Sequence, residues 1–204
     1  MNVDKVESLD KRRCKVFLDG DFAFVLYRGE IKRYKIEAGE ELSETVYGQI
    51  FREIICRRTR ERALYLLQFS GRTEEELKRK LISSFYPEKA VEETITFLKR
   101  YHYLDDMEYA RNYIEVNGKR KSRAELMNTL RHKGVGRECI EALLSEQEPD
   151  EQLQVKHLLE KRRYSDSMSP DEKRKTIAFL MRKGFSYETV RSVMGTLKED
   201  EFFD

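Results

Sequence analysis

The sequence predicts a mainly α-helical protein, an array of three tandem three-helix repeats preceded by a small N-terminal β-hairpin extension. Three observations lead to this fold class. A residue pattern recurs at a shift of fifty positions, and such self-similarity is typical of stacked structural units. Only 3 prolines and 10 glycines occur among 204 residues, which favours long helices. β-branched and aromatic residues concentrate in the first forty residues, where they indicate strands.

The repeat is clearest between residues 130–144, LRHKGVGRECIEALL, and residues 180–194, LMRKGFSYETVRSVM. A shift of fifty superimposes their leading leucines and their Lys-Gly pairs. The same pattern lies forty-nine residues upstream of the first stretch. Its matching apolar positions are Leu77 with Leu126, Leu81 with Leu130, Val91 with Ile140 and Ile95 with Leu144. Because three short helices bury little apolar surface alone, we expect neighbouring repeats to share their hydrophobic faces.

Helix-start signals recur with the same period. A hydroxyl residue followed three positions later by Glu forms a capping box, and this pattern occurs at Thr73–Glu76, Ser122–Glu125 and Ser169–Glu172. The third box has Pro170 at the first helical position. It begins three residues earlier than a strict repeat requires, which predicts a middle helix about one turn longer in the third repeat.

The N-terminal residues are expected to form a hairpin. A turn at Asp19–Asp21 separates two strand-like runs, and a second turn at Arg28–Glu30 predicts a third short strand over Ile31–Ile36. Ser43 is the expected cap of one long helix, or of two helices in series, over 44–69, and the arginines of this segment are expected to form a solvated face. The predicted domains are a hairpin extension over 1–42, a linking helix with the first repeat over 43–105, the second repeat over 106–149 and the third over 150–204.

Composition narrows the class of protein. The net charge is only +2, from 40 basic and 38 acidic side chains, so any affinity for phosphate must come from local clustering of charge. The 3 cysteines are scattered and form no CxxC motif, as expected for free thiols in a reducing cytosol. No run approaches the length of a membrane span, and no signal-peptide core is present. We therefore expect a soluble cytoplasmic protein.

The sequence offers no candidate for catalysis, for a metal ion or for a cofactor. There is no Gly-rich phosphate loop, and the 3 histidines neither flank one another nor pair with cysteine at ligand spacing. Asp105 and Asp106 are adjacent at a predicted helix start, where a capping role explains both. The expected protein is not an enzyme.

Basic residues cluster on the predicted middle helices and the turns beside them, and we name the set the basic stripe. Its members are Lys78, Arg79, Lys80, Lys119, Arg120, Lys121, Arg123, Arg131, Lys133, Arg182 and Lys183. The third helices are acidic or neutral, and only Arg137 would suit base reading at the start of one. The stripe therefore favours contact with phosphates or with an acidic protein surface. Ordinary solvated helix faces remain the alternative reading of each cluster.

Several stretches together resemble the RecX family. They are the Ala63-Leu64 pair, Arg72–Leu77, Tyr103–Asp106 followed by Tyr109-Ala110, and Leu130–Val135. The resemblance covers about Glu61 to Leu197, and it lies in the order and spacing of these motifs rather than in any one of them. The first repeat departs from the pattern, with Ser84–Tyr86 in place of Lys-Gly-apolar, and the third has a longer polar loop.

The resemblance implies a non-enzymatic regulator of the RecA recombinase, in the context of homologous recombination, DNA repair and the SOS response. Such a protein would be a curved, extended monomer that binds RecA filaments on single-stranded DNA along the helical groove. Its expected effect is inhibition of ATP hydrolysis and strand exchange, with weak, non-specific contact to single-stranded DNA and none with membranes. Two alternatives remain open: a free-standing tri-helical DNA-binding regulator and an α-solenoid adaptor for an unrelated protein.

Overall fold

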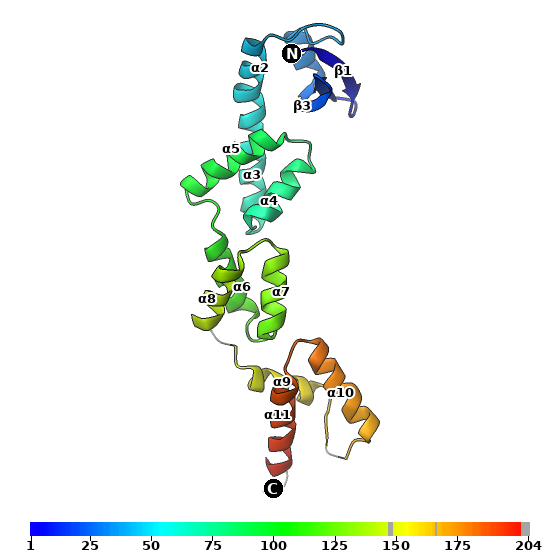
Figure 1. The fold of residues 1–204 in the computed structure, drawn as a ribbon, viewed down its shortest axis with the longest axis vertical. Coiled ribbons are helices and arrows are strands. Elements are labelled where there is room, and N and C mark those ends of the chain that lie inside the picture. Colours follow the sequence, from blue (N-terminus) through cyan, green and yellow to red (C-terminus); the bar gives the residue numbers. More distant parts are fainter. Residues whose placement is uncertain (147–148, 166, 201–204) are drawn as a thin grey trace. The chain divides into compact units, whose positions relative to one another are not determined.

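A computed structural model describes residues 1–146, 149–165 and 167–200, and only the backbone of 196–200. The chain divides into two compact units, one over Met1–Asp105 and one over Asp106–Asp204. The first unit contains the strands and the first three-helix repeat, and the second unit contains the other two repeats (Figure 1).

An antiparallel sheet of three strands opens the first unit. The strands β1 (Val3–Ser8), β2 (Arg13–Leu18) and β3 (Asp21–Tyr27) lie in the order β1-β2-β3. The turn between β2 and β3 contains Asp19 at φ 49° and Gly20 at φ 92°, as in a type I′ hairpin turn. The predicted hairpin is therefore confirmed, with one further strand at its edge.

The predicted strand over Ile31–Ile36 is wrong. Residues Arg28–Arg33 form a short helix, α1, whose first turn is stabilised by the Glu30 carboxylate accepting the Tyr27 N–H at 2.9 Å. The third strand of the sheet is instead β1, which the sequence did not reveal. Only Val3 of β1 is buried, so the strand lacks the apolar alternation by which a half-buried strand is recognised.

One long helical segment links the sheet to the first repeat, as predicted, but its middle is a π-helix. It consists of α2 (Glu44–Ile50), the π-helix η1 (Phe51–Cys56) and α3 (Arg57–Phe69). Ser43 caps it, since its hydroxyl accepts the Val46 N–H at 3.3 Å. The wider π turn rotates the buried face of the helix, so that α2 and η1 cover the sheet whereas α3 packs in the repeat.

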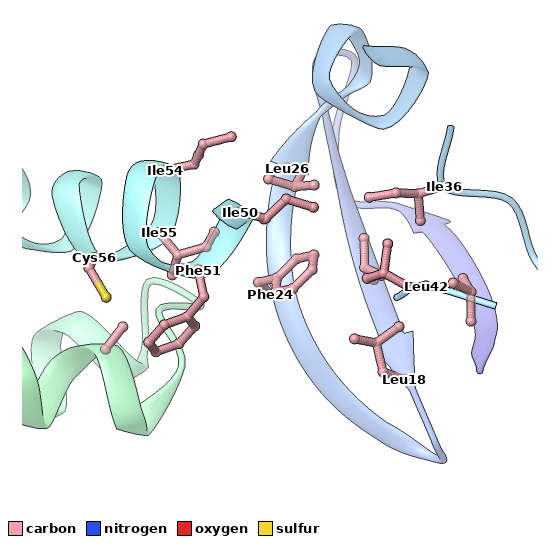
Figure 2. Close-up of a cluster of buried hydrophobic side chains, with 13 residues drawn as sticks. Leu18, Phe24, Leu26, Ile36, Leu42, Ile50, Phe51, Ile54, Ile55 and Cys56 are labelled. Atoms are coloured by element: carbon pink, nitrogen blue, oxygen red, sulfur yellow. The ribbon is translucent and has the colours of Figure 1, made fainter. Parts of the chain in front are cut away.

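The sheet and this helix share a hydrophobic cluster (Figure 2). Figure 2 shows Phe24 and Leu26 of β3 facing Ile50, while Phe51 and Cys56 point toward the neighbouring helix. The Cys56 thiol donates to the Glu93 carboxylate at 3.3 Å. Burial, reinforced by Glu93, raises the pKa of Cys56 to about 11, so this thiol stays protonated and unreactive at neutral pH.

Three helices make up each repeat, and each repeat has its own hydrophobic core. The expectation that neighbouring repeats share their hydrophobic faces is therefore wrong, because the three helices of a repeat bury their apolar side chains against one another. The first repeat contains α3, α4 (Glu74–Ile82) and α5 (Glu88–Arg100). The second and third contain α6 (Asp106–Asn117), α7 (Arg123–His132), α8 (Arg137–Glu146), α9 (Glu151–Lys161), α10 (Pro170–Arg182) and α11 (Tyr187–Asp200). The aligned apolar positions occupy equivalent places in these cores: Leu81, Leu130 and Leu180 are each 0% exposed.

The middle helices all end in the same Schellman turn. The residue in the left-handed conformation is Gly134 at φ 90°, Gly184 at φ 91° and, in the first repeat, Phe85 at φ 65°. In each turn the next N–H returns to the carbonyl of the aligned leucine, at 3.0–3.2 Å. The first repeat therefore departs from the sequence pattern without changing its backbone. Lys15 lies 4.2 Å from the centre of the Phe85 ring and helps to hold it there.

The predicted caps are present, with one difference. Thr73 and Ser169 form complete capping boxes, and α10 has 13 residues against 10 in α7, which confirms the longer middle helix. Ser122 accepts the Glu125 N–H at 3.1 Å. One Glu125 carboxylate oxygen, however, is buried without a hydrogen-bond partner, so this box is only half formed. The Ser122 hydroxyl donates instead to the Lys183 carbonyl at 2.7 Å.

Among the described residues, no helix is both long and apolar enough to cross a membrane.

The close approach at Gly184 can be tested. A Cβ atom there would lie 2.7 Å from the Ser122 hydroxyl oxygen and 3.0 Å from the Ala124 Cβ, and φ 91° is unfavourable for any other residue. We expect Gly184→Ala to lower the free energy of unfolding by about 1–2 kcal/mol. Gly195→Ala, which meets no atom within 4 Å, is the control and should not destabilise. Equal urea midpoints for Gly184→Ala and the unchanged protein would contradict this packing.

Candidate functional site

The basic stripe divides between the two units. Lys78, Arg79 and Lys80 lie on α4 of the first unit, and the other members lie in the second. On α4 two of the three charges are paired within the helix, since Lys78 lies 2.6 Å from Glu74 and Arg79 lies 3.5 Å from Glu75. The Lys80 side chain is exposed.

Glu74 forms ion pairs with two lysines, one on α4 and one on α5. Its carboxylate binds Lys78 and also Lys99 of α5, the latter at 2.8 Å. Burial works against ionisation of Glu74, but its hydrogen bonds with the two lysines outweigh burial and lower its pKa. The Lys78 charge therefore serves the contact between α4 and α5, which leaves Lys80 as the member best placed to meet a partner.

The N-terminal end of α7 joins the second repeat to the third. The Ser122 hydroxyl binds the Lys183 carbonyl at the end of α10, and the Arg123 N–H donates to the Glu151 carboxylate at 2.9 Å. Two of the N–H groups left unpaired at a helix start are thus satisfied, one by Ser122 and one by a residue of the next repeat. The negative Glu151 also complements the positive end of the α7 dipole.

This junction brings together basic residues that are distant in sequence. The loop before α7 and the end of α10 become neighbours, and we name their basic residues the junction cluster. Its members are Lys119, Arg120, Lys121, Arg182 and Lys183. All except Lys121 are exposed. The Lys121 ammonium donates to the Tyr113 hydroxyl at 2.5 Å and lies over the same ring.

Arg131 and Lys133 lie at the other end of α7, about 15 Å along the helix axis for its ten residues. Arg131 is exposed. Lys133 is partly covered, and its ammonium lies 5.3 Å from the centre of the Tyr109 ring. Apart from Arg123, the stripe of the second unit thus consists of two separate patches, the junction cluster and this pair at the α7 end.

Arg123 has an internal role. Its guanidinium donates to the Leu144 carbonyl at 2.8 Å, at the end of α8, while its backbone N–H binds Glu151 of α9. The side chain is only partly exposed. Arg123 therefore ties together three helices. This role was not predictable from the sequence, because the partners lie 21 and 28 residues away.

The contacts of Arg137 argue against recognition of DNA bases by the third helix of the second repeat. Arg137, the residue with suitable chemistry in the sequence, lies on α8 with its guanidinium 2.6 Å from the Glu141 carboxylate. This contact raises the pKa of Arg137 and occupies the donor group that a base would require.

The sequence predicts that a second basic region, on α3, is a solvated face. Arg58 is instead half-buried and binds Glu30 of α1 at 2.5 Å and 2.9 Å. Its guanidinium also lies 4.5 Å from the centre of the Tyr27 ring. The available signal was the spacing of Arg58, Arg62, Tyr65 and Phe69, which places all four on one side of a helix.

The part of the chain that the structure describes has no group of three or more metal-ligating side chains. It does contain a groove of about 760 Å³ between α6 and α9. Ile114 and Leu153 contribute apolar surface to it, and Lys119, His157 and Glu160 are among the polar groups that line it.

The internal role of Arg123 leads to a second prediction. We expect Arg123→Ala to lower the free energy of unfolding of the second unit by about 1.5–3 kcal/mol, because the Leu144 carbonyl loses a charged hydrogen-bond donor. Arg120→Ala removes the same charge from an exposed position and should change stability by less than about 0.5 kcal/mol. Thermal unfolding followed by circular dichroism distinguishes them. Indistinguishable curves for the two variants would show that the Leu144 contact contributes nothing.

Known proteins contain the same three-helix domains that the structure shows. Two family models match the chain: "RecX, first three-helix domain" over residues 60–98, and "RecX, third three-helix domain" over residues 150–194. A protein named "Regulatory protein RecX" from Clostridium botulinum (strain Alaska E43 / Type E3) is 25% identical over 205 residues, covering 98% of this chain and 97% of its own length. Another of that name, from Limosilactobacillus reuteri (strain DSM 20016), is 29% identical, covering 93% of this chain and 75% of its own.

Solved structures of the same name share the fold. One crystal structure of regulatory protein RecX superimposes with a TM-score of 0.66 and 26% identity, covering 95% of this chain and 98% of the other. RecX from Lactobacillus salivarius superimposes with a TM-score of 0.60 and 26% identity, over 70% of this chain and 96% of the other. The resemblance seen in the sequence is confirmed by family models, by relatives that align over nearly the whole chain, and by solved structures. This chain belongs to the RecX family of regulatory proteins.

Proposed function

We propose that this protein binds RecA filaments on single-stranded DNA along the helical groove and inhibits their ATP hydrolysis and strand exchange. Membership of the RecX family is the observation that carries the proposal. The protein would act as a regulator rather than as an enzyme, through contacts made by its repeats.

The repeated placement of positive charge supports this function. Lys80, Lys133 and Lys183 lie near the C-terminal ends of the three middle helices. A filament is itself a repeating array of subunits, so successive repeats of one chain could meet equivalent surfaces on successive subunits. Once one repeat has bound, the next binds at a high effective concentration.

Accessibility decides which basic residues are the best candidates for this contact. Six members of the basic stripe are exposed and have no carboxylate of the described residues within 4.0 Å: Lys80, Lys119, Arg120, Arg131, Arg182 and Lys183. Their proposed targets are acidic protein surface and, weakly and without sequence preference, the backbone of single-stranded DNA.

Inhibition would follow from a difference in affinity between two states of the filament. A bound protein shifts an equilibrium only by as much as it prefers one state. We therefore infer that this protein binds more tightly to a filament conformation that hydrolyses ATP slowly, which would suppress turnover without any catalytic group of its own. The position of Arg137 beside Glu141 argues against the alternative of a sequence-reading regulator on duplex DNA.

Charge reversal at both patches of the second unit tests the proposed surface. We expect the double variant Arg131→Glu, Arg182→Glu to bind filaments on single-stranded DNA about tenfold more weakly, because two exposed attractive charges become repulsive. Co-sedimentation with preformed filaments at moderate salt measures this. Melting temperatures should remain unchanged, since both side chains are exposed.

Arg174→Glu is the matched control for that double variant. Arg174 is equally exposed on α10 but lies near its first turn, beside Asp171. It is expected to sediment with filaments like the unchanged protein. A double variant that binds as tightly as this control, at every salt concentration tested, would exclude the two patches from the interface.

A further inference from the structure

A surface that combines cationic and aromatic side chains lies in the first unit, where the sheet, α3 and the turn between α4 and α5 meet. We name it the cationic-aromatic face and define it by six residues: Lys15, Tyr27, Arg58, Arg62, Tyr65 and Phe69. It contains no member of the basic stripe, and the proposed contact with the RecA filament makes no use of it.

The helix α3 supplies four of the six residues from one side. Arg58, Arg62, Tyr65 and Phe69 are spaced by four, three and four positions, so they form one row about 16 Å long. The Tyr65 and Phe69 rings lie 4.8 Å apart, and the Arg62 guanidinium lies 5.3 Å from the centre of the Tyr65 ring. Two cations are followed by two rings along this row.

The sheet and a turn continue the row beyond the helix. Arg58 is fixed by Glu30 and covers the Tyr27 ring of β3 at 4.5 Å. Lys15 of β2 lies 4.2 Å from the centre of the Phe85 ring, in the turn between α4 and α5. These contacts hold the side chains in place before any ligand arrives, which lowers the entropy that binding would cost.

Two positive charges on this face are not neutralised by neighbouring acids. Arg58 is paired with Glu30, whereas no carboxylate of the described residues lies within 4.0 Å of Lys15 or Arg62. Arg62 and Arg58 also act electrostatically on Tyr86 beside them, where burial raises the pKa of the phenol and both arginines oppose that rise. An anionic ligand would therefore meet a positive field here.

The aromatic rings on this face are open to solvent. Tyr27 is 45% exposed, Tyr65 is 50% exposed and Phe69 is 71% exposed. Exposed apolar side chains that lie together mark a binding site more often than scattered ones do. Bases stack on such rings regardless of sequence, while neighbouring cations bind the phosphates.

We propose that the cationic-aromatic face binds single-stranded DNA directly, with Lys15 and Arg62 contacting phosphates and with Tyr65 and Phe69 stacking on bases. A duplex fits less well, because its bases are already stacked on one another and do not offer their faces. An acidic peptide would satisfy the cations but would leave the exposed rings without a matching partner. This binding needs no recombinase, so it is separate from the proposed contact with RecA filaments.

The test measures binding of a fluorescent oligothymidylate, about 16 nucleotides long, to the full-length protein by anisotropy at low salt, with no recombinase present. We expect Tyr65→Ala to weaken binding about tenfold, as loss of one stacked base does, and Tyr65→Phe to retain it. Arg62→Gln should weaken binding and reduce the slope of log affinity against log salt by about one.

Arg57→Gln is the matched control, because it removes the same charge from the opposite flank of α3, where Arg57 lies 3.6 Å from Glu61. It should bind like the unchanged protein. Circular dichroism melting must show that every variant is folded. Equal affinity of Tyr65→Ala and the unchanged protein would overturn the proposal. Two results would overturn it in favour of a purely electrostatic surface. One is that duplex DNA binds as tightly as the oligothymidylate. The other is that polyglutamate displaces the oligothymidylate and that the Tyr65 and Arg62 variants lose the same affinity.

The tests of the two proposals give separate answers. The oligothymidylate assay contains no filament, and the Arg131 and Arg182 variants do not alter the cationic-aromatic face. If Tyr65→Ala leaves oligothymidylate binding unchanged, the proposal for the cationic-aromatic face has failed, whatever the filament assay shows. If the Arg131→Glu, Arg182→Glu variant keeps its filament binding, the proposed contact of the basic stripe has failed, whatever the oligothymidylate assay shows.

Discussion

The hydrogen bond from the Ser122 hydroxyl to the Lys183 carbonyl determines how the second unit presents its charges. The same hydroxyl caps α7 by accepting the Glu125 N–H, so one small buried side chain both starts a helix and joins two repeats. Gly184 is required beside it, because any Cβ would collide with the Ser122 oxygen. The junction cluster is a consequence of this contact, since it places the end of α10 against the loop before α7.

The Lys-Gly pair at the end of a middle helix serves both the fold and the proposed function. A Schellman turn ends each middle helix, and positive side chains near a helix C-terminus compensate its negative dipole. Lys133 and Lys183 are thus favoured there for reasons of stability alone. Repetition of the turn repeats the charge, as the proposed contact with a repetitive filament requires. Phe85 keeps the turn in the first repeat although it lacks both the lysine and the glycine.

The repeats were predictable from sequence because their signals are local. Leucines at helical spacing identified the cores, and Thr73, Ser122 and Ser169 marked the helix starts. The edge strand β1 and the helix α1 were missed because their stability comes from tertiary contacts rather than from apolar periodicity. The cationic-aromatic face was missed for the same reason: Lys15 meets the Phe85 ring, and Arg58 meets the Tyr27 ring, only when the sheet packs against the helices. Whether the basic stripe binds a partner remains a prediction.

The central claim is that this protein inhibits ATP hydrolysis by binding the recombinase filament, and not by coating the DNA on which the filament forms. The most direct measurement is the rate of single-stranded-DNA-dependent ATP hydrolysis by the cognate recombinase, with this protein titrated in below stoichiometry. Binding to naked single strands and to duplex is measured at the same salt concentration. We expect hydrolysis to fall at concentrations too low to coat the naked DNA. Unchanged hydrolysis, together with tight and sequence-selective binding to duplex, would contradict the account.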